Sequence, residues 1–314
     1  MTAILAQDKT PTLCTVPRPE IADGEVLVKV KAVGVNRGDL LQVAGHYPPP
    51  PGVSEVLGLE CAGFIEDPGT TSRAKGEEVA CLLAGGGYAE FVAVPEGQLF
   101  PVPAGWSMTE AAAIVEVAAT VHSNMQLAGL KAGDTLLIHG GAGGIGTFAI
   151  QYAKALGCTV AVTAGSAEKL DVCRQLGADI LINYREEDFA EVMKNKCNVI
   201  LDIIGAKYLD QNVRALAMDG HLIIIGMQGG VKGELNIGRL LTKRASISAT
   251  ALRARDLADK ARIVADTVHT VWPMLADGRI NHHLSTELPL AEAAKAHQLL
   301  KEGAVTGKIV LVVA

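Results

Sequence analysis

The sequence predicts an α/β protein in which a β-rich region is combined with a six-stranded, doubly wound parallel sheet. Three observations support this fold class. Six short apolar runs alternate with helical segments over the second half of the chain. A glycine-rich turn follows the first of these runs. The residues before Met108 instead form alternating, β-type runs that glycine and proline interrupt.

The six predicted parallel strands can be read directly from the sequence. In chain order they are TLLIH, TVAVT, DILIN, NVILDII, HLIIIG and SISAT. Near-continuous apolar runs such as HLIIIG are typical of strands that are buried on both faces of a sheet. Strands that are separated by helical crossovers in this way are the pattern of a doubly wound sheet.

The glycine-rich turn TLLIHGGAGGIG, residues 135–146, has the pattern of a dinucleotide-binding turn. After the strand, Gly141, Gly143 and Gly146 fall at GxGxxG spacing, and a helical stretch follows. In this pattern the first glycine permits a tight turn, the second lets the backbone approach the phosphates, and the third lets helix and strand pack closely. Because free N–H groups at a helix start attract anions, we expect a nucleotide pyrophosphate here. The alternative is an ordinary glycine-rich turn.

The residues after the second predicted strand favour NADPH over NADH. In NAD-binding proteins a carboxylate usually stands about 20 positions past the turn and binds the ribose 2′-hydroxyl. Here Ser166 takes that place and Lys169 follows, so a 2′-phosphate could accept charge-assisted hydrogen bonds. Tyr184 ends the third strand and is expected near Lys169 at the same sheet edge. Glu168 weakens this interpretation, and Ser166 is alternatively only the N-cap of a helix.

Composition and charge exclude several classes of protein. The 314 residues carry a net charge of −6 and no basic run, so a nucleic-acid-binding surface is not favoured. No apolar stretch approaches the length of a membrane span, and the N-terminus lacks a signal-peptide core, so we expect a cytoplasmic protein. The six cysteines are scattered without a CxxC pair, which indicates neither a disulfide framework nor a structural zinc lobe.

The order of the segments predicts a discontinuous domain. An alanine-rich helical segment from Met108 to a stop at Gly129 separates the β-rich region from the parallel strands. A further helix is expected over residues 256–276, and the last strand, GKIVLVV, cannot easily extend the six-stranded sheet. We therefore expect this strand to return to the β-rich region. The predicted domains comprise residues 1–112 with 254–314, and residues 113–253.

Several segments together resemble one known family. They are GVNRGDLLQVAGHYPPPPG, LGLECAG, GGGYAEFVAVPEG, AAAIVE, the glycine turn, LGADILINYREEDF and GKIVLVV. The whole chain resembles the medium-chain dehydrogenase/reductase superfamily, and in particular its zinc-free quinone oxidoreductase branch of the tumour-suppressor-inducible type. This resemblance implies a GroES-like catalytic domain, a Rossmann domain that binds NADPH, and a homodimer that pairs through the sixth strand of the parallel sheet.

The resemblance also bears on metal. Zinc-dependent members of the superfamily have a cysteine near residues 36–39 and a GHE motif, whereas this chain reads GVNRGD and GLE. Leu59 therefore stands at the histidine position, and Glu60 alone cannot supply a zinc site that needs three protein ligands. We predict no catalytic zinc. Without a Lewis acid, hydride delivery to an electron-poor quinone is the predicted reaction. Reduction of an enone or enoyl thioester, and a non-enzymatic NADPH-binding role, are the alternatives.

Two residues are predicted at the reaction centre. Tyr47 lies before four prolines that stiffen its loop. The resemblance implies that it lies in the cofactor cleft, where its phenol is expected to hydrogen-bond the acceptor carbonyl or the nicotinamide ribose. The alternative is an aromatic cover on the proline loop. Asn36 is predicted to hydrogen-bond the nicotinamide or the substrate, although a turn amide is the alternative. His46 is a weaker candidate for a proton donor. Asp39 is expected only to cap a helix or to pair with Arg37.

The remaining predicted site residues belong to the cofactor. Some of these residues are predicted from the glycine turn and the strand ends, and the others are implied by the family resemblance. The full set is Thr120, Gly141, Gly143, Gly144, Ile145, Gly146, Gly165, Ser166, Lys169, Tyr184, Gly205, Gly226, Met227, Gln228, Leu252, Arg253 and Lys308. For Arg253 and Lys308 an exposed ion pair and a solvated lysine are the respective alternatives.

The chain departs from the family pattern in one helix. Val115 and Ala118 replace a proline and a bulky aromatic residue, and His122 follows where alanine or phenylalanine is common. The wall of the substrate pocket is therefore expected to be wider or more polar, which leaves the identity of the acceptor open.

Overall fold

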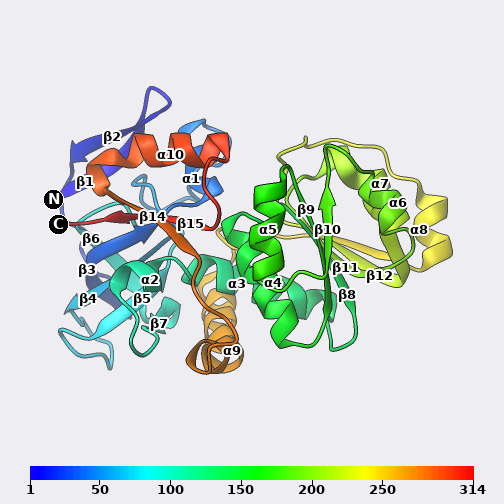
Figure 1. The fold of residues 1–314 in the computed structure, drawn as a ribbon. Coiled ribbons are helices and arrows are strands. Elements are labelled where there is room, and N and C mark those ends of the chain that lie inside the picture. Colours follow the sequence, from blue (N-terminus) through cyan, green and yellow to red (C-terminus); the bar gives the residue numbers. More distant parts are fainter. The chain divides into compact units, whose positions relative to one another are not determined.

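The computed structural model describes all 314 residues, and the chain divides into two compact units (Figure 1). The first, which we call the β-rich unit, comprises Met1–Ala119, Leu252–Asp277 and His282–Ala314. The second, which we call the parallel-sheet unit, comprises Thr120–Ala251 and Gly278–Asn281. No helix is both long enough and apolar enough to span a membrane.

The parallel-sheet unit has the predicted fold. Its six strands lie in the order β10-β9-β8-β11-β12-β13, and every neighbouring pair is parallel. The chain starts at β8, adds β9 and β10 on one side, and then crosses to β11, so the order reverses between β8 and β11. Ligands of such sheets bind at the carboxyl ends of the strands beside this reversal. The strands are β8 (Thr135–His139), β9 (Thr159–Ala164), β10 (Ile180–Asn183), β11 (Cys197–Asp202), β12 (Leu216–Ile224) and β13 (Ser246–Ala249).

Helices cover both faces of this sheet (Figure 1). The central strands are apolar along their length because they are buried on both faces, as Leu137, Ile200 and Leu222 show by being fully buried. The helices are α4 (Gly144–Ala155), α5 (Ala167–Gln175), α6 (Phe189–Val192), α7 (Leu209–Ala215) and α8 (Ile237–Lys243).

The β-rich unit is built on a seven-stranded sheet of order β14-β15-β3-β4-β5-β7, with β6 paired to β3, and a separate β1–β2 pair. The last strand of the chain, β15, pairs antiparallel with β3, so both ends of the chain contribute to one sheet. The strands are β1 (Thr2–Gln7), β2 (Thr10–Thr15), β3 (Glu25–Gly34), β4 (Glu60–Asp67), β5 (Glu78–Leu82), β6 (Phe91–Pro95), β7 (Leu99–Pro101), β14 (Leu284–Pro289) and β15 (Lys308–Val312).

Four α-helices lie wholly within the β-rich unit. Helix α9 begins after the N-cap Asp256, close to the predicted start of the helix over residues 256–276. The four are α1 (Arg37–Val43), α2 (Met108–Ala112), α9 (Leu257–Ala276) and α10 (Ala293–Glu302).

The prediction of one helical segment from Met108 to Gly129 is wrong. The structure breaks it into α2 and α3 (Val115–Ala128). At the break the backbone N–H of Glu116 donates to Glu60 Oε2 at 2.8 Å, a donor that a continuous helix would use on the carbonyl of Ala112. The break therefore supplies a hydrogen bond to a fully buried carboxylate.

Two strand boundaries also differ from those expected. Strand β11 ends at Asp202 instead of running on through Ile204, because the Asp202 carboxylate accepts from the backbone N–H of Ile204 and of Gly205 and turns the chain. Strand β12 begins at Leu216, ahead of the apolar run HLIIIG that predicted it. In both cases hydrogen bonding sets an end that the apolar run does not mark.

Candidate active site

The glycine turn has the geometry that a dinucleotide pyrophosphate requires. Helix α4 begins at Gly144 with Gly143 as its N-cap residue. A Cβ on Gly146 would overlap the carbonyl oxygens of Gly140 and Gly141, whereas a Cβ on Gly143 would meet only the Gly140 oxygen, at 3.6 Å. Gly146 is thus glycine because helix and turn pack together, and Gly143 leaves open space at the helix N-terminus. Gly144 and Ile145 carry free N–H groups of the first turn.

The corner predicted for a 2′-phosphate lies at the end of β9. Ser166 is the N-cap of α5, and its hydroxyl accepts from the Lys169 backbone at 3.4 Å. A Cβ on Gly165 would lie 2.5 Å from the Tyr184 hydroxyl, so the tyrosine crosses the end of β9 as predicted from the shared sheet edge. A hydrogen bond from Ser166 lowers the pKa of Glu168, so a carboxylate also stands at this corner.

The segment after β11 brings two predicted glycines together. Gly205 has φ of +78°, a conformation that favours glycine, and a Cβ there would lie 3.1 Å from the Gly226 carbonyl oxygen. Gln228 donates its backbone N–H to Ile203 at 3.2 Å, and the side chain of Met227 is 58% exposed. These residues follow the adjacent strands β11 and β12, so they line one edge of the parallel sheet.

A buried polar chain that the sequence analysis missed supports this segment. The Asp202 carboxylate accepts from Ile204, from Gly205 and, at 3.0 Å, from Asn212 Nδ2. Asn212 Oδ1 can only accept, so His139 Nε2, at 2.7 Å, carries the proton. Burial raises the pKa of Asp202 to about 6 and lowers the pKa of His139 to about 4. The sequence signal for this chain was a polar residue at the end of each of two buried strands, His139 in β8 and Asp202 in β11.

Of the three residues in α3 that depart from the family pattern, the structure explains His122. His122 is fully buried, and its Nδ1 lies 2.9 Å from the Tyr152 hydroxyl within the parallel-sheet unit. The imidazole therefore adds no polarity to an exposed wall. Thr120, the predicted nicotinamide neighbour on the same helix, is 7% exposed.

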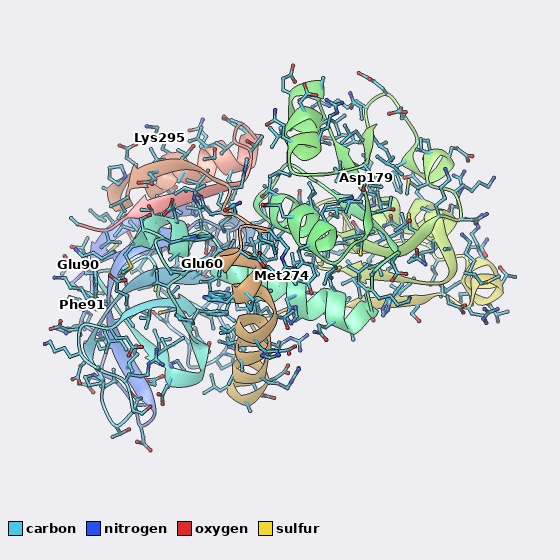
Figure 2. The ribbon with its side chains drawn as sticks, turned by 60° about the horizontal axis from the view of Figure 1, so that its bottom comes forward. Glu60, Glu90, Phe91, Asp179, Met274 and Lys295 are labelled. Carbon is cyan, nitrogen blue, oxygen red and sulfur yellow. The ribbon has the colours of Figure 1, made fainter.

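In the β-rich unit, Glu60, Lys308 and Asn36 form a buried ionic cluster. Lys308 Nζ donates to Glu60 Oε1 at 2.6 Å, to Asn36 Oδ1 at 2.7 Å and to the Val35 carbonyl oxygen at 3.2 Å. Asn36 Nδ2 donates to Glu60 Oε1 at 2.8 Å. Glu60 lies in the interior of the unit, whereas Lys295 lies at its outside (Figure 2). Lys308, which could have been a solvated lysine, is 4% exposed and anchors Asn36.

This cluster limits what Asn36 and Glu60 can do. The Asn36 amide has both ends engaged, since Nδ2 also lies 3.4 Å from the Gly34 carbonyl oxygen, so only one Oδ1 lone pair is open to a ligand. Glu60 accepts from Lys308, Asn36 and the Glu116 backbone. No group of three His, Cys, Asp or Glu side chains is placed to hold a metal ion. The residues present therefore do not fit a zinc site.

A second buried chain runs from Asp39 through Tyr88 to His297. The Tyr88 hydroxyl lies 3.0 Å from Asp39 Oδ2 and 3.3 Å from His297 Nε2. Asp39 also accepts from the Asn36 backbone at 2.8 Å, so it caps α1 as expected, and it makes no ion pair with Arg37. Burial raises the pKa of Asp39 to about 6 and lowers the pKa of His297 to about 4.

The opposite pKa shifts of Asp39 and His297 are expected to cancel in the pH dependence of stability. Between about pH 4 and pH 6 the folded pair holds a neutral carboxyl and a neutral imidazole. The unfolded chain holds a carboxylate and an imidazolium in that range. Both states bind the same number of protons, so the pair contributes no slope to the free energy of unfolding.

When one of the two residues is replaced, the other makes the free energy of unfolding depend on pH. In His297→Gln the folded Asp39 binds a proton that the unfolded chain has lost, so the free energy of unfolding falls by about 2 kcal/mol as the pH rises from 4 to 6. In Asp39→Asn the unfolded His297 binds the extra proton, so the same quantity rises by about 3 kcal/mol between pH 4 and 6.5. Urea unfolding across this range measures both slopes, and parallel curves for the two variants contradict the assignment.

Tyr47 lies under a buried arginine. The Arg253 guanidinium carbon stands 4.9 Å from the centre of the Tyr47 ring. Burial raises the pKa of Tyr47, Arg253 acts to lower it, and Glu116 acts to raise it. The Tyr47 hydroxyl has no hydrogen-bond partner within the chain, so it is available to a ligand, whereas His46 is exposed. Leu252, which precedes the arginine, is partly buried.

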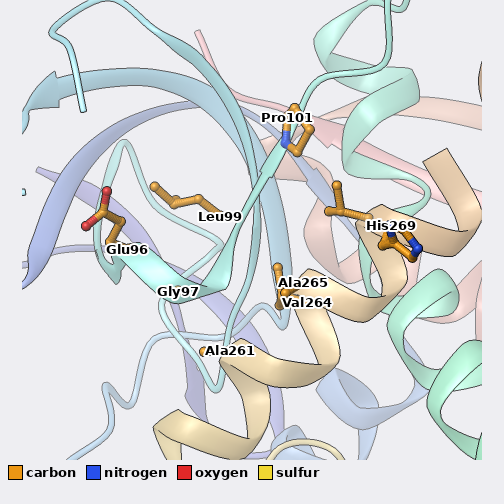
Figure 3. A pocket seen from close by; sticks show the side chains of 9 residues that line it. Glu96, Gly97, Leu99, Pro101, Ala261, Val264, Ala265 and His269 are labelled. Carbon is orange, nitrogen blue, oxygen red and sulfur yellow. The ribbon is translucent and has the colours of Figure 1, made fainter. Parts of the chain in front are cut away.

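A shallow hollow of about 480 Å³ lies elsewhere in the β-rich unit, between α9 and the segment 96–101 (Figure 3). It contains none of the predicted site residues, so the predicted cofactor and substrate site does not depend on it. Its lining residues are Glu96, Gly97, Leu99, Pro101, Ala261, Val264, Ala265, Val268 and His269.

Comparison with protein families and known structures agrees with this geometry. Residues 22–104 match the alcohol dehydrogenase GroES-like domain, and residues 144–266 match the zinc-binding dehydrogenase family. A quinone oxidoreductase of Pseudomonas aeruginosa is 32% identical over 296 residues, which are 91% of this chain and 90% of that protein. The structure of the Escherichia coli quinone oxidoreductase complexed with NADPH is 27% identical, with a TM-score of 0.90 over 99% of this chain and 100% of that chain.

A different relative is much longer than this chain. A phthioceranic/hydroxyphthioceranic acid synthase of Mycobacterium tuberculosis is 32% identical over 298 residues, which are 92% of this chain but only 14% of the synthase. The two matched domain families define a dehydrogenase/reductase of the medium-chain type. The chain belongs to the quinone oxidoreductase branch of the medium-chain dehydrogenase/reductase superfamily, which confirms the resemblance seen in the sequence.

Proposed function

We propose that the protein reduces quinones with NADPH by hydride transfer and without zinc. The observation that carries this proposal is the glycine turn at the start of α4, together with the corner of Ser166, Lys169 and Tyr184, where no carboxylate ends β9. The NADPH found in the structure of the Escherichia coli relative supports the same cofactor.

When bound, the cofactor supplies the hydride, and the residues of this chain position it and supply a proton. The first turn of α4 would hold the pyrophosphate, and Lys169 and Tyr184 would bind the 2′-phosphate. The hydroxyl of Tyr47 donates its proton to the acceptor oxygen. The predicted cofactor domain, residues 113–253, differs in its bounds from the parallel-sheet unit, which comprises Thr120–Ala251 and Gly278–Asn281.

A second candidate is reduction of the double bond of an enone or enoyl thioester. This candidate is supported by the similarity of the chain to a segment of the phthioceranic/hydroxyphthioceranic acid synthase. A screen of NADPH oxidation separates the candidates, with ortho- and para-quinones, enones and crotonyl thioesters as acceptors. We expect turnover with at least one quinone class. Turnover with crotonyl thioester alone selects the second candidate, and NADPH binding without oxidation of any acceptor selects a non-enzymatic role.

We also propose a homodimer that pairs through β13. This strand is the edge of the parallel sheet, so its outer hydrogen-bonding groups are available to a second copy. The neighbouring α8 exposes Ile237 and Leu241, which are 68% and 72% exposed and lie one turn apart. A monomer mass in light scattering at micromolar concentration contradicts the dimer. The cytoplasmic location inferred from the sequence stays a prediction.

A further inference from the structure

Arg253 connects two loops of the β-rich unit. Its guanidinium donates from Nε to the Ala84 carbonyl oxygen at 2.6 Å, from Nη1 to the Tyr47 carbonyl oxygen at 2.9 Å, and from Nη2 to Gln42 Oε1 at 2.7 Å. The residue is only 4% exposed. All three acceptors are neutral oxygens, so no carboxylate bonded to the guanidinium cancels its charge.

The loop after Tyr47 is poorly able to hold itself in place. Pro48 to Pro51 have no backbone N–H groups, so this stretch cannot form a hydrogen-bonded ladder of its own. The Tyr47 carbonyl oxygen has Arg253 as its hydrogen-bond donor, and the Tyr47 ring lies against the same guanidinium. One side chain therefore fixes both the backbone and the ring of Tyr47.

We propose that Arg253 is a positioning residue for Tyr47, which it holds in place and whose loss of a proton it favours by its charge. This inference rests on the proposed function, because it assigns Tyr47 as proton donor. In the step, hydride from the reduced nicotinamide adds to the acceptor, the Tyr47 O–H bond breaks, and its proton goes to the acceptor oxygen. The electron pair stays on the tyrosinate oxygen, which then takes a proton from water.

The titratable groups that act on Tyr47 support this arrangement. Burial raises the pKa of the phenol and so opposes proton loss, and Glu116 acts in the same direction. Arg253 is the group that acts the other way. Loss of the guanidinium therefore removes the one favourable charge as well as the loop contact.

The test is Arg253→Met, with Arg253→Lys as the variant that keeps the charge but loses the three-donor fork. We expect Arg253→Met to lower kcat about 10- to 100-fold, with the Kd of NADPH changed less than about 2-fold. In a Tyr47→Phe background the same substitution is expected to cost less than about 2-fold, because the group that it positions is already gone. Lys260→Met is the matched control. Lys260 is another buried cation near Arg253, is 4% exposed, and makes no side-chain hydrogen bond.

A spectroscopic readout separates this inference from the proposed function. The ionisation of Tyr47 is measured by ultraviolet absorbance as the difference between each protein and its Tyr47→Phe counterpart, which needs no turnover. We expect the apparent pKa of Tyr47 to rise in Arg253→Met and to change least in Arg253→Lys and Lys260→Met. An unchanged titration overturns the inference, as does an equal loss of kcat in the Tyr47→Phe background or a loss confined to NADPH binding. Absence of turnover in the unaltered protein overturns only the proposed function.

Discussion

Replacing Gly146 by alanine is expected to weaken NADPH binding and to destabilise the parallel-sheet unit. The new Cβ would overlap the carbonyl oxygens of Gly140 and Gly141, which are backbone atoms and cannot rotate away. Helix α4 would have to move from the turn, so we expect a loss of about 3 kcal/mol in the free energy of unfolding. Displacement of the helix N-terminus also moves the N–H groups that we assign to the phosphates, so the Kd for NADPH is expected to rise more than about 10-fold.

Gly143→Ala is the matched variant that separates folding from binding. Gly143 has φ of −81°, which any residue adopts, and a Cβ there meets only one oxygen, at 3.6 Å. We expect the free energy of unfolding to change by less than about 1 kcal/mol. The Kd for NADPH should still rise about 10-fold or more, because the methyl group would occupy the space that we assign to the approaching phosphates. Unaltered NADPH binding by Gly143→Ala contradicts the assignment of this turn to the pyrophosphate.

The second large effect is expected at Lys308. In Lys308→Met the fully buried Glu60 carboxylate loses the ammonium 2.6 Å away. Breaking a buried ion pair from one side costs about 3–5 kcal/mol, because an uncompensated charge stays buried. Urea unfolding should show this loss in the β-rich unit, and the Asn36 amide should lose its anchor at the same time.

Two further variants identify the cause of that effect. Glu60→Gln added to Lys308→Met removes the unpaired charge while keeping an acceptor for Asn36 and for the Glu116 backbone, so we expect more than half of the stability to return. Lys295→Met removes an exposed lysine, whose side chain is 60% exposed, and should change stability by less than about 0.5 kcal/mol. A loss below about 1 kcal/mol in Lys308→Met contradicts a structural ion pair.

The parallel sheet and its glycine turn were predictable because their signals are local. Each apolar strand lies within a few residues of its own turn, and the order of strands follows from the alternation with helices. The same holds for Tyr184, which reaches the end of β9 because neighbouring parallel strands share an edge. Both findings depend on periodicity and on short spacing, which a single sequence contains.

The buried clusters of the β-rich unit were not predictable in this way. Lys308 and Glu60 are 248 positions apart, and Arg253 reaches Gln42 across 211 positions. The first pair forms because both ends of the chain join one sheet, and no periodicity marks which lysine is buried. The break between α2 and α3 has the same origin, since it serves a carboxylate 56 positions away. Long-range hydrogen bonding overrides helix propensity there.

The most direct test of the account is a titration of the purified protein with NADPH and, separately, with NADH. We expect NADPH to bind with a Kd at least about 10-fold lower than that of NADH, because we assign Lys169 and Tyr184 to the 2′-phosphate and no carboxylate ends β9. Absence of NADPH binding, or an equal or tighter affinity for NADH, contradicts the cofactor on which the proposed function depends.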